Sequence, residues 1–173
     1  MTDAARSIAL ALFRETREHG EIEAVTSDLA QLARLASSHE VRRFLYHPRI
    51  PLEDKERILA PSVGNELVRR VLSILLYTRA TGLIAAVNAA FVRLVRRERG
   101  FVETVARVAQ PLTPAQEEEI RTAVAAATGL TPVMKVQVDP QLIGGVRLTI
   151  DGRVADNSLK SRLERLKESL EAL

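Results

Sequence analysis

Three histidines, His19, His39 and His47, are the residues of this chain best suited to bind a metal ion. Imidazoles on a helix ligate zinc together when they lie one turn apart, at positions i and i+4. No pair of these histidines has that spacing, and the chain has no cysteine to supply a thiolate or a disulfide. We therefore expect no metal site and interpret the histidines as surface or capping residues.

The residues needed for nucleophilic or phosphate chemistry are also missing. There is no G-x-S-x-G elbow, and Ser158 beside Asp156 is better explained as the cap of a following helix. There is no G-x-x-x-x-G-K-[ST] loop, and Gly144-Gly145 lacks the strand and helix context of a dinucleotide site. The acidic run 117–119 falls in the first turn of an expected helix, where the helix dipole favours negative charge. The sequence predicts a protein that is not an enzyme and holds no cofactor.

The first hundred residues have helical periodicity. We expect helices at 3–18, at 21–37, in a short segment that carries Val41, Phe44 and Leu45, and at 52–60, 64–79 and 83–99. Ser37 and Glu40 have capping-box spacing and should begin the third of these helices. Gly100 should end the sixth. Short connections between six helices favour a bundle.

The period changes from helical to strand-like at Phe101, so we place a domain boundary at about residue 100. A strand from Phe101, a helix capped by Thr113 and Gln116, and a strand at Met134–Val138 favour a parallel crossover. Asp151-Gly152 is a two-residue hairpin turn, and leucines spaced 4, 3 and 4 apart follow in a last helix. The predicted fold is α plus α/β: a six-helix bundle over 1–100, then a small α/β domain with a mixed sheet over 101–173.

Composition excludes several classes of protein. The 25 basic and 22 acidic residues leave a net charge of only +3, and aromatic residues make up 3% of the chain, too few to form stacking platforms for bases. The longest uncharged apolar window, 80–92, is too short to span a bilayer, and the N-terminus shows no secretory signal. Apolar residues nevertheless cover more than one face of the expected helix at 64–79. That helix is either central in the bundle or part of a groove that receives a partner helix.

The sequence at 142–158 resembles the signature of the F-type ATP synthase delta subunits, whose mitochondrial relative is the oligomycin-sensitivity-conferring protein. The signature is a Leu-Ile-Gly-Gly run, an alternating strand, a Gly turn, and a D-x-S segment before a leucine-rich helix. Family members usually read D-G-S where this chain has Asp156-Asn157-Ser158. Two further segments resemble the family: Phe44–Pro48 with Lys55, which follows an "fL-x-x-P…K" pattern, and Gln110–Thr113, which follows an "xPLs" pattern.

The resemblance implies a stator that joins the catalytic head of the ATP synthase to its peripheral stalk and so supports proton-driven ATP synthesis. In this family the helical N-terminal domain binds the N-terminal helices of the alpha subunits. The beta subunits are a further candidate partner. The C-terminal domain binds the C-terminal end of the stalk b subunit. The implied location is peripheral, at the cytoplasmic face of the bacterial plasma membrane, with membrane contact only through the complex and no nucleic-acid partner.

The apolar surplus and the resemblance together suggest which residues meet each partner. We expect the head-binding groove to be lined by residues from the first and fifth helices: Ile8, Ala11, Leu12, Ile74 and Tyr77. The stalk-binding or family-motif residues are Leu142, Ile143, Gly144, Gly145, Asp156, Ser158, Leu163 and Leu166. The glycine pair is a bend or bulge in the chain, or a contact point for the partner.

The arginines at 93, 96, 97 and 99 form one basic cluster. They either complement the dipole at the end of the sixth helix or contact an acidic protein surface.

Two alternative functions remain beside the stator. The first is a small basic nucleic-acid-binding or ribosome-associated protein, which the weak net charge opposes. The second is a hydrolase, for which the chain lacks any pairing of nucleophile and base.

Overall fold

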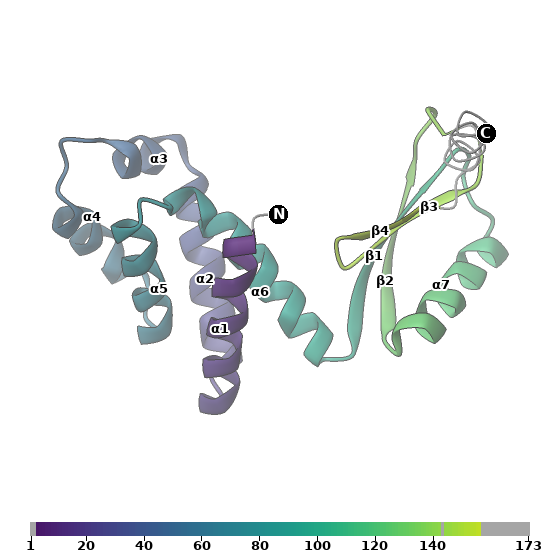
Figure 1. The fold of residues 1–173 in the computed structure, drawn as a ribbon, viewed down its shortest axis with the longest axis horizontal. Coiled ribbons are helices and arrows are strands. Elements are labelled where there is room, and N and C mark those ends of the chain that lie inside the picture. The colour runs from purple at the N-terminus through teal and green to yellow at the C-terminus, as the bar shows by residue number, and fades with distance from the viewer. Residues whose placement is uncertain (1–2, 143, 157–173) are drawn as a thin grey trace, which may run out of the picture. The chain divides into compact units, whose positions relative to one another are not determined.

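The chain has a helix-rich α plus β fold with a mixed four-stranded sheet, as the sequence predicts (Figure 1). This computed structural model describes residues 3–142 and 144–156. The contacts divide the chain into two compact units, Met1–Val95 and Arg96–Leu173, which we call the helical unit and the sheet unit.

Six α-helices precede the first strand. They are α1 (Asp3–His19), α2 (Ile22–Ser37), α3 (His39–Tyr46), α4 (Leu52–Leu59), α5 (Glu66–Tyr77) and α6 (Ile84–Glu98), with short 3₁₀ turns η1 (Ala60–Ser62) and η2 (Thr81–Leu83). Each helix is amphipathic, and each places at least one apolar side chain in a single buried cluster. Phe13 of α1 and Phe91 of α6 meet edge to face inside it, with ring centroids 6.1 Å apart. The helical unit therefore has one core of its own.

Ser38, not Ser37, caps α3. The Ser38 side chain accepts a hydrogen bond from the backbone N–H of Val41, whereas the Ser37 hydroxyl donates to the carbonyl oxygen of Ala33 within α2. The predicted capping box at Ser37 and Glu40 is therefore wrong by one residue. The physical reason is that α2 continues through Ser37, which removes that residue from the cap position.

The sheet unit contains β1 (Phe101–Val108), α7 (Pro114–Thr128), β2 (Thr131–Val138), β3 (Val146–Ile150) and β4 (Arg153–Asp156). The strand order is β2-β1-β3-β4. β1 and β2 are parallel and joined through α7, which confirms the predicted crossover, and the remaining pairs are antiparallel. Thr113 and Gln116 form the predicted capping box at the start of α7.

The hairpin between β3 and β4 forms as predicted. Asp151 and Gly152 have φ angles of +50° and +80°, which suits a two-residue turn with both central residues in the left-handed region. On β1 the side chains of Val102, Ala106 and Val108 are buried in alternation with more exposed ones. The last helix expected after Asp156 lies outside the described residues.

The contact boundary at Val95 lies within α6, a little before the change of sequence period at Gly100. The last turn of α6 belongs to the sheet unit and makes ion pairs within it: Arg96 Nη1 lies 3.9 Å from Glu103 Oε2, and Arg97 Nη1 lies 3.7 Å from Asp151 Oδ2. Gly100 itself has a φ of +82°, in keeping with its predicted role as the helix stop.

Candidate functional site

The described residues hold no group of His, Cys, Asp or Glu that could bind a metal ion. Nor does any helix in the described ranges combine the length and apolar character needed to cross a membrane. His19 ends α1, where its Nδ1 lies 2.8 Å from the carbonyl oxygen of Glu15. That carbonyl raises the pKa of His19, and the carboxylates of Glu15, Glu21 and Glu18 raise it further. A protonated imidazole suits the C-terminal end of a helix, so His19 has a structural explanation.

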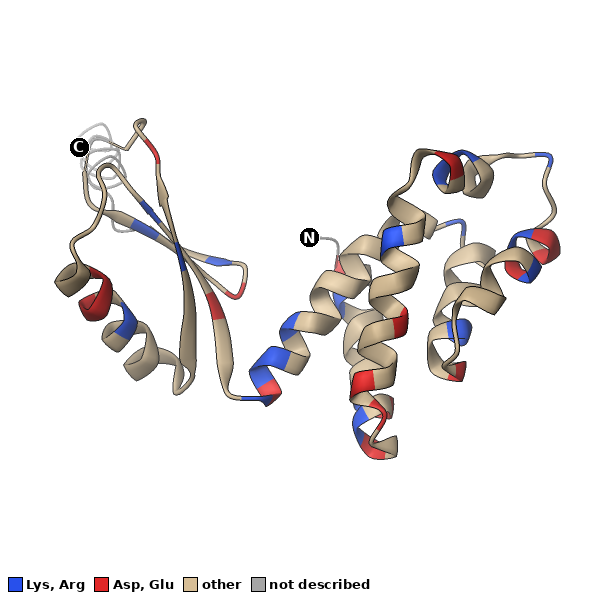
Figure 2. Ribbon diagram, turned by 180° about the vertical axis from the view of Figure 1, so that it is seen from behind, with Lys and Arg blue, Asp and Glu red and all other residues tan. Residues whose placement is uncertain are grey.

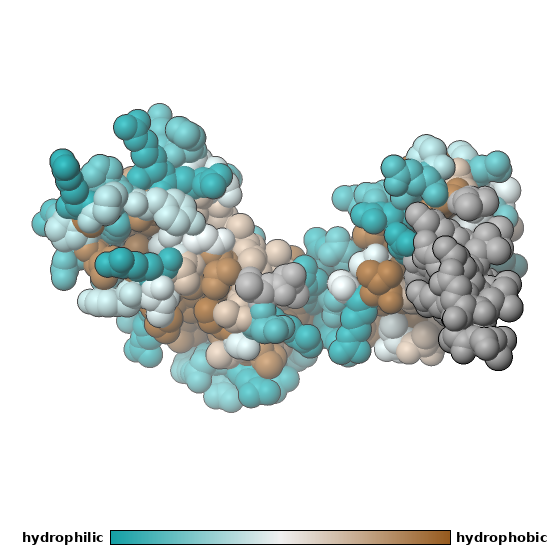
Figure 3. Space-filling model, turned by 45° about the horizontal axis from the view of Figure 1, so that its top comes forward, coloured by the Kyte–Doolittle hydropathy of each residue, from teal (hydrophilic) through white to brown (hydrophobic). Residues whose placement is uncertain are grey.

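The exposed face of α5 is the main apolar feature of the helical unit. Ile74 is 53% exposed and Tyr77 is 64% exposed, although Leu75 and Leu76 between them are buried. On the face shown in Figure 3, apolar side chains of this unit come to the surface in several places between polar ones. Large apolar side chains left in water at the end of a core helix are typical of a surface that meets a partner.

The predicted residues of α1 fall in different environments. Leu12 is 4% exposed and belongs to the core, so its predicted place in the lining of the groove is not supported: its face of α1 packs inward. Ile8 is half-buried and packs against the core, and Ala11 is exposed. Because α1 packs against α5, the structure brings the two helices of the expected groove together.

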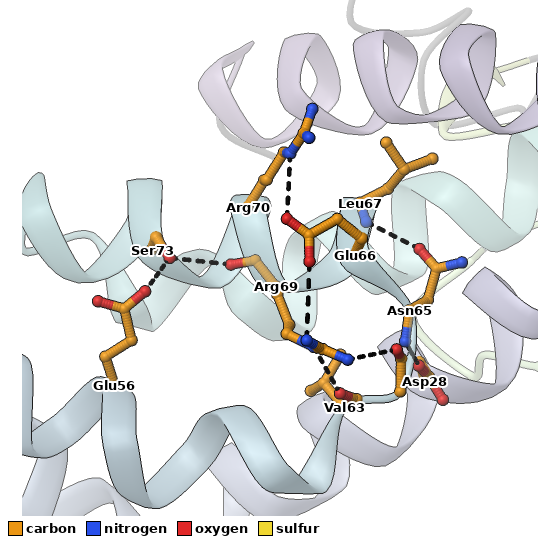
Figure 4. Close-up of polar contacts among 10 residues, drawn as sticks. Asp28, Glu56, Val63, Asn65, Glu66, Leu67, Arg69, Arg70 and Ser73 are labelled. Atoms are coloured by element: carbon orange, nitrogen blue, oxygen red, sulfur yellow. Dashed lines mark hydrogen bonds and ion pairs between the residues drawn. The ribbon is translucent and has the colours of Figure 1, made fainter.

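A polar network at the start of α5 fixes the position of this helix (Figure 4). Asn65 caps α5: its side-chain oxygen accepts a hydrogen bond from the backbone N–H of Leu67 at 2.9 Å. The backbone N–H of Asn65 donates to the carboxylate of Asp28 on α2 at 2.6 Å, and the side-chain Nδ2 of Asn65 donates to the carboxylate of Glu21 at the same distance. These bonds tie the beginning of α5 to α2.

Arg69 and Ser73 attach α5 to the segment before it. The Arg69 guanidinium donates to the carbonyl oxygens of Val63 at 3.0 Å and Gly64 at 2.7 Å. The Ser73 hydroxyl donates to the carboxylate of Glu56 on α4. In Figure 4 these contacts lie on one side of α5, and Leu67 and Arg70 point to the other. The network therefore holds α5 from one side and leaves another side for the apolar face.

Lys55 explains the family-like pattern at Phe44–Pro48. It is 6% exposed, and its Nζ donates to the carbonyl oxygen of His47 at 2.9 Å. This bond closes the turn between α3 and α4, because His47 is the residue that ends α3. In the sequence Lys55 stands out only as part of a family-like motif. Its spacing of eight residues from His47 gave no signal of this contact.

The segment that contains Leu142–Gly145 crosses the end of β1. Its beginning and its end both meet Val108, the last residue of that strand: the N–H of Asp139 donates to the Val108 carbonyl at 2.8 Å, and Val146 is the register partner of Val108. Leu142 is buried, and its N–H donates to the carbonyl of Asp139 at 3.0 Å. The chain therefore passes from β2, on one side of β1, to β3, on the other side, between Val138 and Val146.

Gly145 supplies the backbone conformation for this crossing. Its φ is +81°, in the region that glycine adopts without steric cost. Of the other motif residues, Asp156 ends β4, and its side chain lies outside the described part of the chain. Ile143, Ser158, Leu163 and Leu166 lie outside the described residues as well.

Basic residues gather on the last turns of α6 (Figure 2). Arg96 and Arg97 make the ion pairs with Glu103 and Asp151 described above, and Arg93 and Arg99 also have interactions within the chain. Exposed pairs of this kind contribute little to stability, in the range of roughly 0–1 kcal/mol. The cluster is thus partly neutralised by its own chain, which weakens the case for a nucleic-acid surface.

Comparison with known proteins gives one consistent result. The family model described as "ATP synthase delta (OSCP) subunit" matches residues 4–170. An ATP synthase subunit delta from Caulobacter vibrioides is 36% identical over 98% of this chain and 95% of its own length. One from Heliobacterium modesticaldum is 32% identical, with 96% and 92% covered. The fold matches a chain in a cryo-EM structure of the Toxoplasma gondii mitochondrial ATP synthase hexamer. In that match the TM-score is 0.72, the identity is 22%, and 99% of both chains is covered.

Proposed function

This chain belongs to the ATP synthase delta (OSCP) subunit family, and we propose that it is a non-catalytic stator subunit joining the catalytic head of an F-type ATP synthase to its peripheral stalk. The observation that carries the proposal is the family match over residues 4–170, which includes both compact units. The alternative of a small nucleic-acid-binding protein has no support from the relatives or from the charge.

A stator works through binding alone. Rotation of the rotor exerts torque on the catalytic head, and the head must stay fixed to the membrane-bound part for ion flow to drive ATP synthesis. A chain that holds the head through one unit and the stalk through the other supplies that connection. It needs rigid units and two durable interfaces, and it needs no reactive group.

The helical unit, a bundle of six helices, is the half that we assign to the head. Ile74 and Tyr77 on α5, with Ile8 and Ala11 on the adjoining α1, form the proposed seat for an amphipathic N-terminal helix of an alpha subunit. Support comes from the exposure of the two large α5 side chains and from the packing of α1 on α5. Apolar anchors of this size carry most of the binding energy when a helix lies in a groove.

The sheet unit is the half that we assign to the C-terminal end of the stalk b subunit. The buried Leu142 and the positive φ of Gly145 support a structural role for the Leu-Ile-Gly-Gly run, which then shapes the surface that the stalk meets. This division places the functional boundary at about residue 100. The chain would sit peripherally on the cytoplasmic side of the membrane, held there only by the complex.

A bridging experiment tests the proposal. The purified chain is mixed with the isolated catalytic head and with the soluble portion of the b subunit, and the masses of the complexes are measured by analytical ultracentrifugation. We expect binary complexes with each partner and a ternary complex only when the chain is present. A chain that binds neither partner, or that binds both but never together, would refute the stator role.

A further inference from the structure

A trough on the helical unit is lined by residues that belong to neither proposed contact. Two adjoining hollows of about 320 and 260 Å³ share Leu45 and Tyr46, at the end of α3, and Thr81 of η2. The first hollow extends over the turn between α3 and α4 and the end of α5, and the second extends toward the end of α2 and the start of α6. None of the residues that line the trough belongs to the surface of Ile8, Ala11, Ile74 and Tyr77.

Tyr46 stands between the two hollows and is itself exposed. A Cβ on Gly82 would lie only 2.7 Å from the Tyr46 hydroxyl oxygen, although the φ of Gly82 is one that other residues also adopt. The glycine at this position therefore leaves room for the Tyr46 hydroxyl beside η2. The ring forms a ridge along which an apolar side chain of a ligand could pack.

The charged residues of the trough are all basic. Arg42 lines the smaller hollow, and Lys55 and Arg79 line the larger one, with no acidic residue among the lining residues of either. The acids beside Lys55 on α4 are engaged elsewhere, since Asp54 pairs with Arg57 and Glu56 accepts from Ser73. Lys55 is nine-tenths buried and uses one of its three ammonium protons for the His47 carbonyl. A buried ammonium with unused donors at the wall of a hollow favours an anionic ligand.

Arg79 occupies a backbone position that usually belongs to glycine. The N–H groups of Arg79 and Ala80 donate to the carbonyls of Leu76 at 3.0 Å and Leu75 at 2.8 Å, which is the double hydrogen bond of a Schellman helix end. The φ of Arg79 is +55°, where any Cβ is sterically strained. Such strain at a non-glycine residue points to a use for its side chain. Here that side chain borders the larger hollow and makes no ion pair with another described residue.

We propose that this trough binds an acidic peptide segment of a partner protein. A carboxylate of the segment pairs with Lys55 and Arg79, and an apolar side chain next to it packs beside Tyr46 on the walls that Leu45 and Leu76 provide. The mixture of basic groups with apolar walls selects a peptide rather than a free anion, because a free anion gains nothing from the apolar walls. The inference adds a third contact to a stator with two, and its residues are independent of both.

The test uses the full chain alone, so that failure of the stator role does not affect the result. The probe is a blocked tetrapeptide, Leu-Glu-Leu-Glu, titrated into labelled protein while backbone amide shifts are followed by NMR. The matched control peptide is Leu-Gln-Leu-Gln, which has the same shape without the charge. We expect the largest shifts around Tyr46, Lys55 and Arg79, and at least about tenfold weaker binding of the control peptide, as for loss of a charge-assisted hydrogen bond.

Arg79→Gly is the most informative variant, because glycine suits this backbone position better than arginine. We expect its melting temperature to be equal or higher and its affinity for the acidic peptide to fall by about tenfold. Arg57→Gln removes an exposed cation from α4 outside the trough and should change neither. Lys55→Gln, checked by thermal melting because it disturbs the His47 bond, should also weaken binding.

Three outcomes would overturn the proposal. Equal binding of the two peptides would show that charge is not recognised. Full affinity in Arg79→Gly would show that the arginine serves only the helix end. Tighter binding of inorganic phosphate than of the peptide, with the same shifts, would make the trough a site for a free anion.

Discussion

Replacing Ile74 with Asp should weaken binding of this chain to the catalytic head by at least about 2 kcal/mol, or roughly 30-fold in the dissociation constant. Ile74 is 53% exposed, so about half of its side chain remains to be covered by a partner. Full burial of an isoleucine contributes about 1.5–3 kcal/mol, so covering the exposed half contributes about 1 kcal/mol. A carboxylate forced into the same contact loses hydration that costs about 1–3 kcal/mol more.

The substitution should leave the fold intact. Ile74 is outside the buried core, and the network that anchors α5 involves Asn65, Arg69 and Ser73 instead. An acid in the last turn of a helix opposes the helix dipole by roughly 0.3–1 kcal/mol, so a small fall in melting temperature is expected. Binding should be measured well below that temperature.

The assay is a titration of the isolated head with fluorescently labelled chain, and the chain offers a matched control. Ile58 on α4 is 58% exposed, close to the value for Ile74, and is not among the residues of the proposed groove. Ile58→Asp should bind the head as tightly as the unmodified chain. Equal affinities for Ile74→Asp and the unmodified chain, with both folded, would refute the assignment of the α5 face to the head. Equal losses in both variants would show that the assay reports charge and not a specific contact.

Three further predictions concern stability. A fragment of residues 1–100 should fold alone, because the helices α1–α6 share one core; a far-UV circular dichroism spectrum without helical minima would contradict this. Gly145→Val should destabilise the sheet unit by roughly 1–2 kcal/mol, because a Cβ at its φ of +81° is strained; a melting curve identical to that of the unmodified chain would leave the glycine without a backbone role. Asn65→Ala should cost about 1 kcal/mol in chemical denaturation through loss of the α5 cap, whereas an unchanged midpoint would mean that Asn65 does not stabilise α5.

Local patterns predicted the elements well. The capping box of Thr113 and Gln116 and the turn at Asp151-Gly152 form as expected, because each depends on residues close together in the sequence. The predicted cap at Ser37 was wrong because Ser37 and Ser38 are adjacent and either serine satisfies a local cap pattern. The predicted helix at 21–37 already contained Ser37, so that serine could not also cap the next helix; the structure keeps the helix end and places the cap at Ser38.

Contacts between distant segments could not be predicted from the pattern. The bond from Asn65 to Asp28 joins residues 37 positions apart, and no periodicity links them. The burial of Leu12 could not be predicted from the pattern either, because Leu12 shares a helix with Ile8 but lies in the core. Periodicity identifies apolar stripes, and only the packing of neighbouring helices shows which stripe is covered. The sequence pointed to Ile74 and Tyr77 as surface residues of α5, and the structure exposes both, whereas it buries Leu12, which the same prediction had placed beside them.

The most direct test of the stator role compares two activities of one reconstituted enzyme. ATP synthase stripped of its native delta-type subunit is returned to liposomes with or without this chain, and ATP hydrolysis and ion-gradient-driven ATP synthesis are both measured. A stator should restore ATP synthesis many-fold while changing hydrolysis little, because the head retains its catalytic sites and only the mechanical connection is repaired. Restoration of synthesis by the chain, and its failure with a fragment of either unit alone, is the predicted result. Full synthesis without the chain, or no gain when the chain is bound, would contradict the stator role.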